Sequence, residues 1–419
     1  MKTLRRTAVA ALLLALCLSA APPAAFYLHD GDRVVFYGDS ITDQRLYTTF
    51  VETYVVTRFP RMKVSFVHSG VGGDRVTGGW AGPIDVRLPR DVIAYKPDVM
   101  TIMLGMNDGS YRAYDQAIFD TFASGYRHIV STMKKALPGI RITVIQPSPF
   151  DDVTRPPTFA GGYNKVLVRY GEFVKELGRD ENLTVADLNT PVVEALEKAD
   201  QLDAETAKKL VPDRVHPGPG GHLLMAEALL KAWHAPATVT SVEIDAAKPA
   251  VSSAVNTQVT DLTAGERVSW TQADDALPMP VDEKDPVVAL ALRASDFVEA
   301  MDQEVLTVTG LTAARYTLQI DGEKAGTFTK EEWAKGVNLA TLATPMAKQA
   351  AAVHDLTLKH NEVHFARWRM ADVNLDSIAV PPAHLHAADE ALDTLEADVV
   401  AAQRAAAQPK SHRYELVAE

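Results

Sequence analysis

Four short stretches of the sequence combine the residue types that acyl-transfer chemistry requires. A serine nucleophile needs a base to take its proton, and the tetrahedral intermediate needs hydrogen-bond donors for its oxyanion. In chain order the stretches are Gly38-Asp39-Ser40, Gly70-Val71-Gly72-Gly73, Gly105-Met106-Asn107-Asp108 and Asp213-Arg214-Val215-His216. Each stretch has an ordinary explanation on its own, so the interpretation depends on their combination and order.

Ser40 is the candidate nucleophile. The glycine at position 38 permits a sharp turn from a strand into a helix, which exposes the Ser40 hydroxyl near the first helical residues. The backbone N–H of Ser40 can then point at a ligand oxygen. An Asp-Ser pair is also an ordinary helix cap, so the turn alone does not establish a nucleophile.

The candidate oxyanion donors are the backbone N–H groups of Ser40 and Gly73 and the side-chain amide of Asn107. Three glycines within residues 70–73 let the backbone approach a ligand closely. A plain loop explains these glycines equally well, and Asn-Asp pairs are common in turns. The glycine-rich loop lacks the spacing and the lysine of a phosphate-binding motif.

Asp213 and His216 are the candidate carboxylate and base. An aspartate three residues before a histidine can accept the Nδ1–H of the imidazole, which fixes the tautomer and stabilises the imidazolium. A surface aspartate and a histidine at a helix start are the alternative. His222 falls inside the following predicted helix and is interpreted as structural.

The elements that must position these stretches alternate between strands and helices from about residue 26 to 235. Apolar runs predict strands at 33–37, 64–67, 99–104, 142–145 and 183–186. Helices are predicted at 44–58, 115–136, 161–178, 190–210 and 220–233. This alternation is typical of an α/β fold with a parallel sheet covered on both faces, where ligand sites gather at the carboxyl ends of the strands.

With these four blocks the chain resembles the SGNH/GDSL hydrolase family over about residues 30–234. The resemblance implies a flavodoxin-like three-layer α/β/α sandwich with strand order 2-1-3-4-5 and a triad of Ser40, His216 and Asp213. It also implies hydrolysis of carboxylic esters. One departure is His68, where many members have an asparagine. We expect neither a metal nor a cofactor, because the histidines are scattered and no cluster has ligand spacing.

The second half of the chain has a different sequence pattern, with alternating and β-branched residues. We predict a mainly β domain over 236–385, with helix around 285–302 and 340–353 and a hairpin turn at Asp321-Gly322. A closing helix and tail follow at 386–419, and the polar residues after Gln408 are expected to fray. The tryptophans considered as sugar-binding platforms, with core packing as the commoner role, are Trp270, Trp333 and Trp368.

The N-terminal residues have the layout of a secretory signal peptide, which we place at 1–25. A basic start precedes an apolar run from Ala8 to Leu18 and then small residues. An uncleaved anchor is the alternative; otherwise we expect an exported protein, periplasmic or secreted, with no membrane span in its mature form. The only cysteine, Cys17, lies in the apolar run. The net charge of -12 argues against nucleic acid as a partner.

The function that fits these observations is that of an exported serine esterase acting on a small-molecule or carbohydrate ester, with deacetylation of a carbohydrate as the favoured substrate class. A lysophospholipase or thioesterase-type acylhydrolase is the alternative within the same chemistry. A non-catalytic carbohydrate-binding surface protein is the alternative from another class. Loop residues expected to border the pocket are Trp80, Tyr111, Phe150, Tyr163 and the stretch 151–157.

Overall fold

A parallel sheet organises the first half of the chain. The computed structural model describes residues 25–265, 267–375, 378 and 380–419. The sheet has the order β2-β1-β5-β6-β7, with every neighbouring pair parallel. Its strands are β1 (Arg33–Gly38), β2 (Ser65–Gly70), β5 (Val99–Met103), β6 (Arg141–Gln146) and β7 (Thr184–Asp187). The α/β fold and strand order expected from the sequence are confirmed. Apart from Ala25, the predicted signal peptide lies outside the described residues and stays a prediction.

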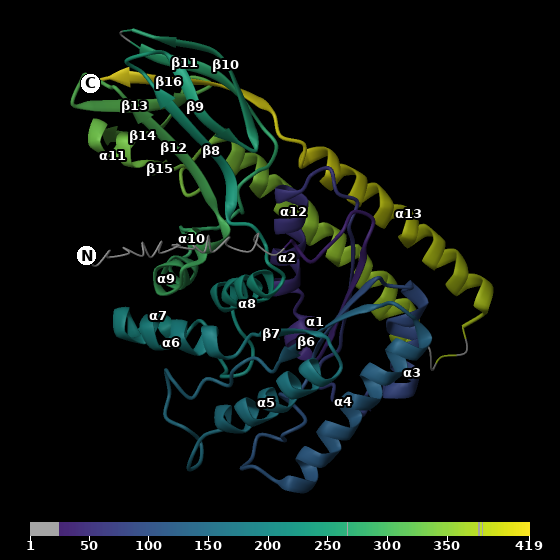
Figure 1. The fold of residues 1–419 in the computed structure, drawn as a ribbon. Coiled ribbons are helices and arrows are strands. Elements are labelled where there is room, and N and C mark those ends of the chain that lie inside the picture. Colours follow the sequence, from purple (N-terminus) through teal and green to yellow (C-terminus); the bar gives the residue numbers. More distant parts are fainter. Residues whose placement is uncertain (1–24, 266, 376–377, 379) are drawn as a thin grey trace, which may run out of the picture.

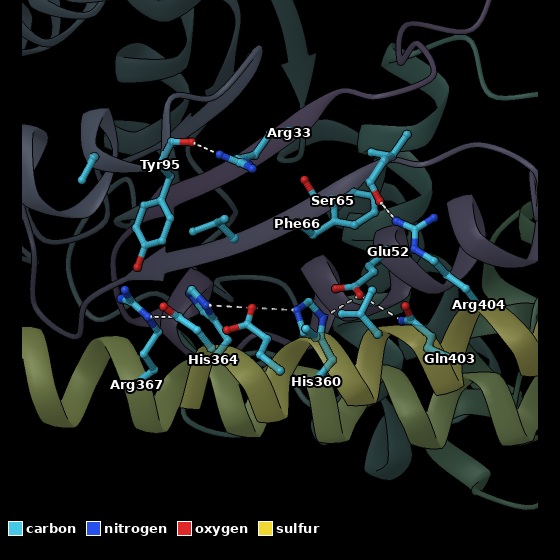
Figure 2. A pocket seen from close by; sticks show the side chains of 17 residues that line it. Arg33, Glu52, Ser65, Phe66, Tyr95, His360, His364, Arg367, Gln403 and Arg404 are labelled. Carbon is cyan, nitrogen blue, oxygen red and sulfur yellow. Dashed lines mark hydrogen bonds and ion pairs between the residues drawn. The ribbon is translucent and has the colours of Figure 1, made fainter. Parts of the chain in front are cut away.

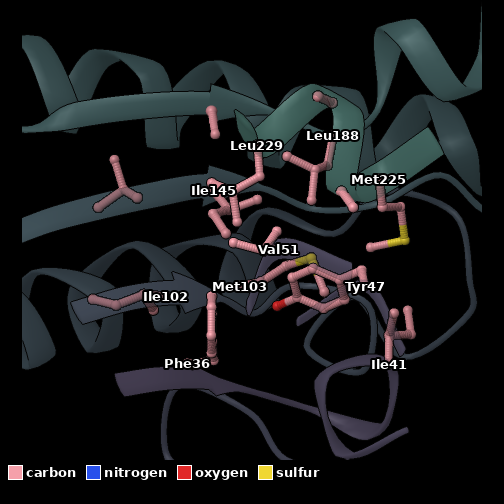
Figure 3. Close-up of a cluster of buried hydrophobic side chains, with 14 of the residues drawn as sticks. Phe36, Ile41, Tyr47, Val51, Ile102, Met103, Ile145, Leu188, Met225 and Leu229 are labelled. Atoms are coloured by element: carbon pink, nitrogen blue, oxygen red, sulfur yellow. The ribbon is translucent and has the colours of Figure 1, made fainter. Parts of the chain in front are cut away.

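Helices cover both faces of this sheet, as the buried central strands require. Figure 1 shows α2 (Leu46–Arg58) and α8 (Pro219–Ala232) on one face. The opposite face carries α3 (Ile84–Asp91), α4 (Gln116–Ala136) and α5 (Asn164–Asp180). In the core of Figure 3, Phe36 and Met103 from the sheet meet side chains of α2 and α8. Beside them, α6 (Thr190–Leu202) and the short α7 (Ala204–Ala207) follow β7.

The carboxyl ends of the strands bring the predicted blocks to one edge of the sheet. β1 ends at Gly38 and β2 at Gly70, and α1 (Ser40–Asp43) packs directly over both ends. A Cβ atom on Gly38 would collide with Thr42, and one on Gly70 would collide with the backbone of Asp43. Glycine at both positions therefore lets α1 lie against the strand ends.

The second half of the chain forms two sheets packed face to face. One has the order β15-β12-β8-β9 and the other β10-β11-β16-β13-β14. Their bounds are β8 (Thr238–Asp245), β9 (Ala250–Val255), β10 (Thr257–Ala264), β11 (Arg267–Asp274), β12 (Gln303–Thr309), β13 (Arg315–Ile320), β14 (Glu323–Thr329), β15 (Val337–Asn338) and β16 (Ser411–Ala418). Buried side chains from both sheets share one core. The region is thus mainly β, as predicted.

Local details of this region follow the sequence in most places. The Asp321-Gly322 turn joins β13 to β14, and both residues have positive φ, as a tight hairpin requires. Helices α9 (Pro286–Ala294), α10 (Phe297–Met301) and α11 (Lys330–Lys335) lie between the strands. The candidate platforms Trp270, Trp333 and Trp368 are all buried and fill cores, so none is a sugar-binding surface.

The prediction that the residues after Gln408 fray is wrong. Residues 411–418 form β16, which pairs with both β11 and β13 in the interior of its sheet. His412, Tyr414 and Leu416 point into the core while their neighbours are more exposed, which is the period-2 pattern of a strand with one buried face. The Tyr414 ring stacks on Trp270 at 5.2 Å between centroids.

Three helical segments extend from the β region over the α/β half before the chain returns to the β sheets as β16. They are α12 (Pro345–Phe365), the π-helical segment η2 (Ala366–Asn374) and α13 (Pro382–Ala406). Figure 1 shows α12 and α13 side by side, and α12 packs along α2. The helix predicted at 340–353 is therefore longer and starts later, at Pro345, where Thr344 caps it.

A buried ionic cluster joins these helices to the α/β half. Glu52 of α2 accepts from His360 Nδ1 at 2.8 Å, and His360 Nε2 lies 3.1 Å from Glu396 of α13. Gln403 donates to Glu52 at 2.9 Å, and His68 Nε2 lies 3.2 Å from the same carboxylate. Figure 2 shows Glu52, His360 and Gln403 of this cluster beside a cavity of about 400 Å³. His68, the departure from the family pattern, thus belongs to this cluster.

The cluster holds His360 as a cation. Burial alone would lower its pKa, but the carboxylates of Glu52 and Glu396 outweigh burial and raise the pKa to about 10. The pKa of Glu52 falls well below its usual range, because His360 and His68 outweigh the effect of burial. Burial lowers the pKa of His68 to about 4, so its ring stays neutral near pH 7.

We expect His360→Gln to destabilise the fold by about 3–5 kcal/mol, because it leaves two carboxylates without their cation. The folded-state pKa of His360 lies above its ordinary 6.5, so its contribution is complete below that pH and declines toward about pH 10. Glu52 contributes fully above pH 4.5 and less as the pH falls. Denaturant unfolding across this pH range measures the difference, which should be largest between pH 4.5 and 6.5.

The matched control is Lys359→Gln, which changes an exposed neighbour on the same helix. A His360→Gln protein as stable as the Lys359→Gln protein at pH 6 would contradict this role of the cluster.

Candidate active site

Ser40, His216 and Asp213 form one continuous chain of hydrogen bonds. Ser40 Oγ lies 2.8 Å from His216 Nε2, and His216 Nδ1 lies 2.7 Å from Asp213 Oδ2. The other oxygen of Asp213 accepts the backbone N–H groups of Val215 at 3.0 Å and His216 at 2.7 Å. Asp213 therefore fixes both the loop and the imidazole that it orients. The structure brings together all three residues predicted from spacing.

The turn before Ser40 is held by a buried carboxylate. Asp39 caps α1 by accepting the N–H of Ile41 at 3.0 Å. Burial, with smaller contributions from Asp108 and Asp74, raises the pKa of Asp39 to about 7. The capping bond fixes the first helical turn, so Ser40 stands at its start with the hydroxyl directed to His216.

The glycine-rich loop passes next to Ser40. A Cβ atom on Gly72 would lie 4.0 Å from the Ser40 Cβ, and the Gly72 N–H donates to Asp43 Oδ2 at 3.0 Å. Gly73 has φ +78°, a conformation that glycine adopts without strain. Asp74 follows and is paired with the buried Arg87. The loop is thus held on both sides of Gly73.

Asn107 is oriented by two hydrogen bonds of its amide. Its Nδ2 donates to the Asp74 carbonyl at 3.1 Å, and its Oδ1 accepts the Tyr111 hydroxyl at 2.9 Å. Ser110 and Tyr111 have φ near +55°, at 56° and 54°, which is strained backbone for residues with side chains. That strained turn carries the Tyr111 hydroxyl back to Asn107.

A third buried carboxylate joins the two loops. Asp108 Oδ1 accepts the N–H of Val76 at 3.0 Å, which ties the turn after β5 to the glycine-rich loop. Burial raises the pKa of Asp108 to about 7 and that of Asp74 to about 6, although Arg87 opposes the shift at Asp74. Sequence reasoning missed the supporting roles of Asp39, Asp74 and Asp108, since only their adjacency to the blocks is visible in the sequence.

The aromatic loop residues divide into two groups. Phe150 and Tyr163 are buried and pack edge to face at 5.4 Å, so they close loops onto the core. Tyr111 and Trp80 are exposed, at 42% and 60% of their surface. His222 is buried, accepts the N–H of Tyr47 at 3.2 Å, and has its pKa lowered by burial to about 3. Its interpretation as structural is confirmed.

The 151–157 stretch braces the loop that carries Asp213 and His216. The Asp151 N–H donates to the Arg214 carbonyl at 2.9 Å, and Arg214 donates back to the carbonyl of Asp151 at 3.2 Å. Arg155 donates to the carbonyls of Val211 and Pro212. These bonds give the 151–157 stretch a structural role next to the site.

Comparisons with known proteins agree with this geometry. Residues 36–224 match the model of the GDSL-like lipase/acylhydrolase family. An acetylxylan esterase of Geobacillus stearothermophilus is 26% identical over 228 residues, which cover 48% of this chain and 93% of that protein. The solved structure of a gut microbial diltiazem-metabolizing enzyme is 25% identical and superimposes with a TM-score of 0.81. The match covers 94% of this chain and 99% of that enzyme's chain.

The last comparison extends beyond the α/β half, so both parts of this chain recur together in that solved enzyme. The family match spans all four blocks, from the strand before Ser40 to the helix after His216. The α/β half of this chain therefore belongs to the SGNH/GDSL hydrolase family, and the protein is a carboxylic ester hydrolase.

Proposed function

We propose that this protein is an exported serine esterase that removes small acyl groups, acetyl above all, from a carbohydrate by way of an acyl-enzyme on Ser40. The observation that carries the proposal is the hydrogen-bonded chain from Ser40 through His216 to Asp213. It supplies the nucleophile, its base and the group that orients the base.

In the first half-reaction Ser40 Oγ attacks the ester carbonyl and its proton passes to His216 Nε2. Asp213 stabilises the imidazolium, which is short-lived because His216 returns the proton to the departing alcohol. The negative oxygen of the intermediate is received by the N–H groups of Ser40 and Gly73 and the amide of Asn107. The acyl group is then bound to Ser40 as an ester.

In the second half-reaction water replaces the alcohol. His216 takes a proton from the water, whose oxygen attacks the acyl-Ser40 carbonyl, and then returns a proton to Ser40 Oγ as the acid leaves. The same oxyanion donors serve both steps, so their positions matter twice in each cycle.

The proposed substrate class, an acetylated carbohydrate, is supported by similarity to a known esterase. The acetylxylan esterase relative is named for removing acetyl groups from a xylan, and 48% of this chain aligns with it. This likeness favours a short acyl group over the long chain of a lysophospholipid.

Export is supported by the basic start, apolar run and small residues at the N-terminus. Throughout the part of the chain that the structure describes, no helix is long and apolar enough to cross a bilayer.

We expect Ser40→Ala to lower kcat by about 10⁴- to 10⁶-fold, leaving only the residual effect of the oxyanion donors. Acetate release from acetylated xylo-oligosaccharides, compared with hydrolysis of a lysophospholipid and an acyl thioester, measures both the loss and the substrate class. Ser124→Ala on α4 is the control, because that serine is exposed and distant in sequence. Near-native turnover by Ser40→Ala would refute the nucleophile, and faster lysophospholipid hydrolysis would refute the substrate class.

We expect Tyr111→Phe to lower kcat by about 3- to 10-fold, because the amide of Asn107 loses one of its two orienting hydrogen bonds. Asn107→Ala removes the donor itself and should cost about 10²- to 10³-fold. Steady-state kinetics on one small acetate ester rank the two variants. Tyr114→Phe is the control, because that hydroxyl bonds only to the exposed Gln116 side chain among the described residues. Equal activity of the Tyr111→Phe and Tyr114→Phe proteins would contradict the orienting role.

A further inference from the structure

A tryptophan stands exposed beside the proposed nucleophile. The indole of Trp80 is 60% exposed, and its Nε1–H donates to the Gly72 carbonyl at 2.9 Å. Gly72 is the residue whose Cβ position lies 4.0 Å from Ser40 Cβ. The hydrogen bond fixes the orientation of a large apolar ring that the fold leaves in solvent next to Ser40.

An arginine from the C-terminal region covers one side of this ring. The guanidinium carbon of Arg369 lies 4.7 Å from the centroid of Trp80. Its Nη2 donates to Asp43 Oδ2 at 3.1 Å, and the same oxygen accepts the Gly72 N–H. Arg369 thus touches both the ring and the carboxylate that holds the glycine-rich loop. This cation–π contact covers one face of the Trp80 ring and leaves the other face for a ligand.

The loop that carries Trp80 is pinned by neighbours of Arg369. Trp80 and Ala81 form the tip between β3 (Gly78–Gly79) and β4 (Gly82–Pro83). Ala81 is buried in a small apolar cluster with Val71 of the glycine-rich loop and Trp368 and Val373 of η2. Trp368 Nε1 also donates to Asp91 at 3.0 Å. The tip is therefore rigid although its tryptophan is exposed.

We infer that Trp80, backed by Arg369, is the subsite that binds the alcohol part of the substrate, a pyranose ring lying with its C–H face on the indole. The inference rests on the proposed function, since a small acyl group leaves the rest of the ester outside the catalytic residues. An aromatic face of fixed orientation binds the apolar face of a sugar with little loss of entropy. Arg369 makes the C-terminal region part of substrate selection.

The kinetic test compares two acetate esters that differ only in the alcohol. Trp80→Ala should raise KM for acetylated xylotriose by about 3- to 10-fold, while kinetics on ethyl acetate stay within about twofold, because ethanol is too small to reach the ring. Trp80→Phe keeps a flat ring and should restore most of the affinity. Arg369→Gln should shift KM for xylotriose acetate in the same direction as Trp80→Ala.

Arg367→Gln is the matched control for Arg369, because Arg367 lies on the same segment and pairs with Asp393 and Asp372 away from the loop. It should leave KM for both esters unchanged. An equal effect of Trp80→Ala on the two esters, or none on either, would overturn the subsite.

Calorimetry with unacetylated xylotriose separates this inference from the esterase proposal. The Ser40→Ala protein should bind xylotriose, and the Ser40→Ala/Trp80→Ala protein should bind it about 3- to 10-fold more weakly. If the wild-type chain cleaves neither ester, the proposed function fails, and calorimetry alone decides the subsite. Equal binding by the two proteins, or no binding by either, would overturn it.

Discussion

The hydrogen bond between Ser40 and His216 joins residues 176 positions apart, and the rest of the α/β half serves to make it. Ser40 follows the strand β1, while His216 precedes the helix α8, which packs against α2 on one face of the sheet. The two loops meet because parallel strands deliver their carboxyl ends to one edge. Any shift of α8 relative to β1 would separate nucleophile from base.

Three buried carboxyl groups surround that bond, and burying them lowers the stability of the fold. Asp39 and Asp108 each accept a backbone N–H of the site, and Asp74 pairs with the buried Arg87. Burial raises the pKa of all three. A carboxyl buried at such a cost persists where its hydrogen bonds fix geometry that function needs. Together with the strained turn at Ser110 and Tyr111, they keep the proposed oxyanion donors in place before a substrate arrives.

The sequence predicted this half of the molecule well, because its signals are local. Apolar runs marked the strands, and the four blocks marked the loops. The remaining features depend on distant partners: Glu52 meets His360 at a separation of 308 residues, and Arg369 meets Asp43 at 326. β16 was missed because its inward residues, such as His412 and Tyr414, carry polar atoms and alternate with charged neighbours, which resembles a solvated tail until β11 and β13 lie on either side.

The central claim is that Ser40 is an activated nucleophile, and covalent labelling tests it most directly. A fluorophosphonate reacts with a serine only where a base and oxyanion donors assist it. After labelling of the intact protein and proteolysis, mass spectrometry should find the phosphonyl adduct on the peptide containing Ser40, and His216→Ala should abolish it. A protein that stays unlabelled, or that carries the adduct on another serine, would contradict the account.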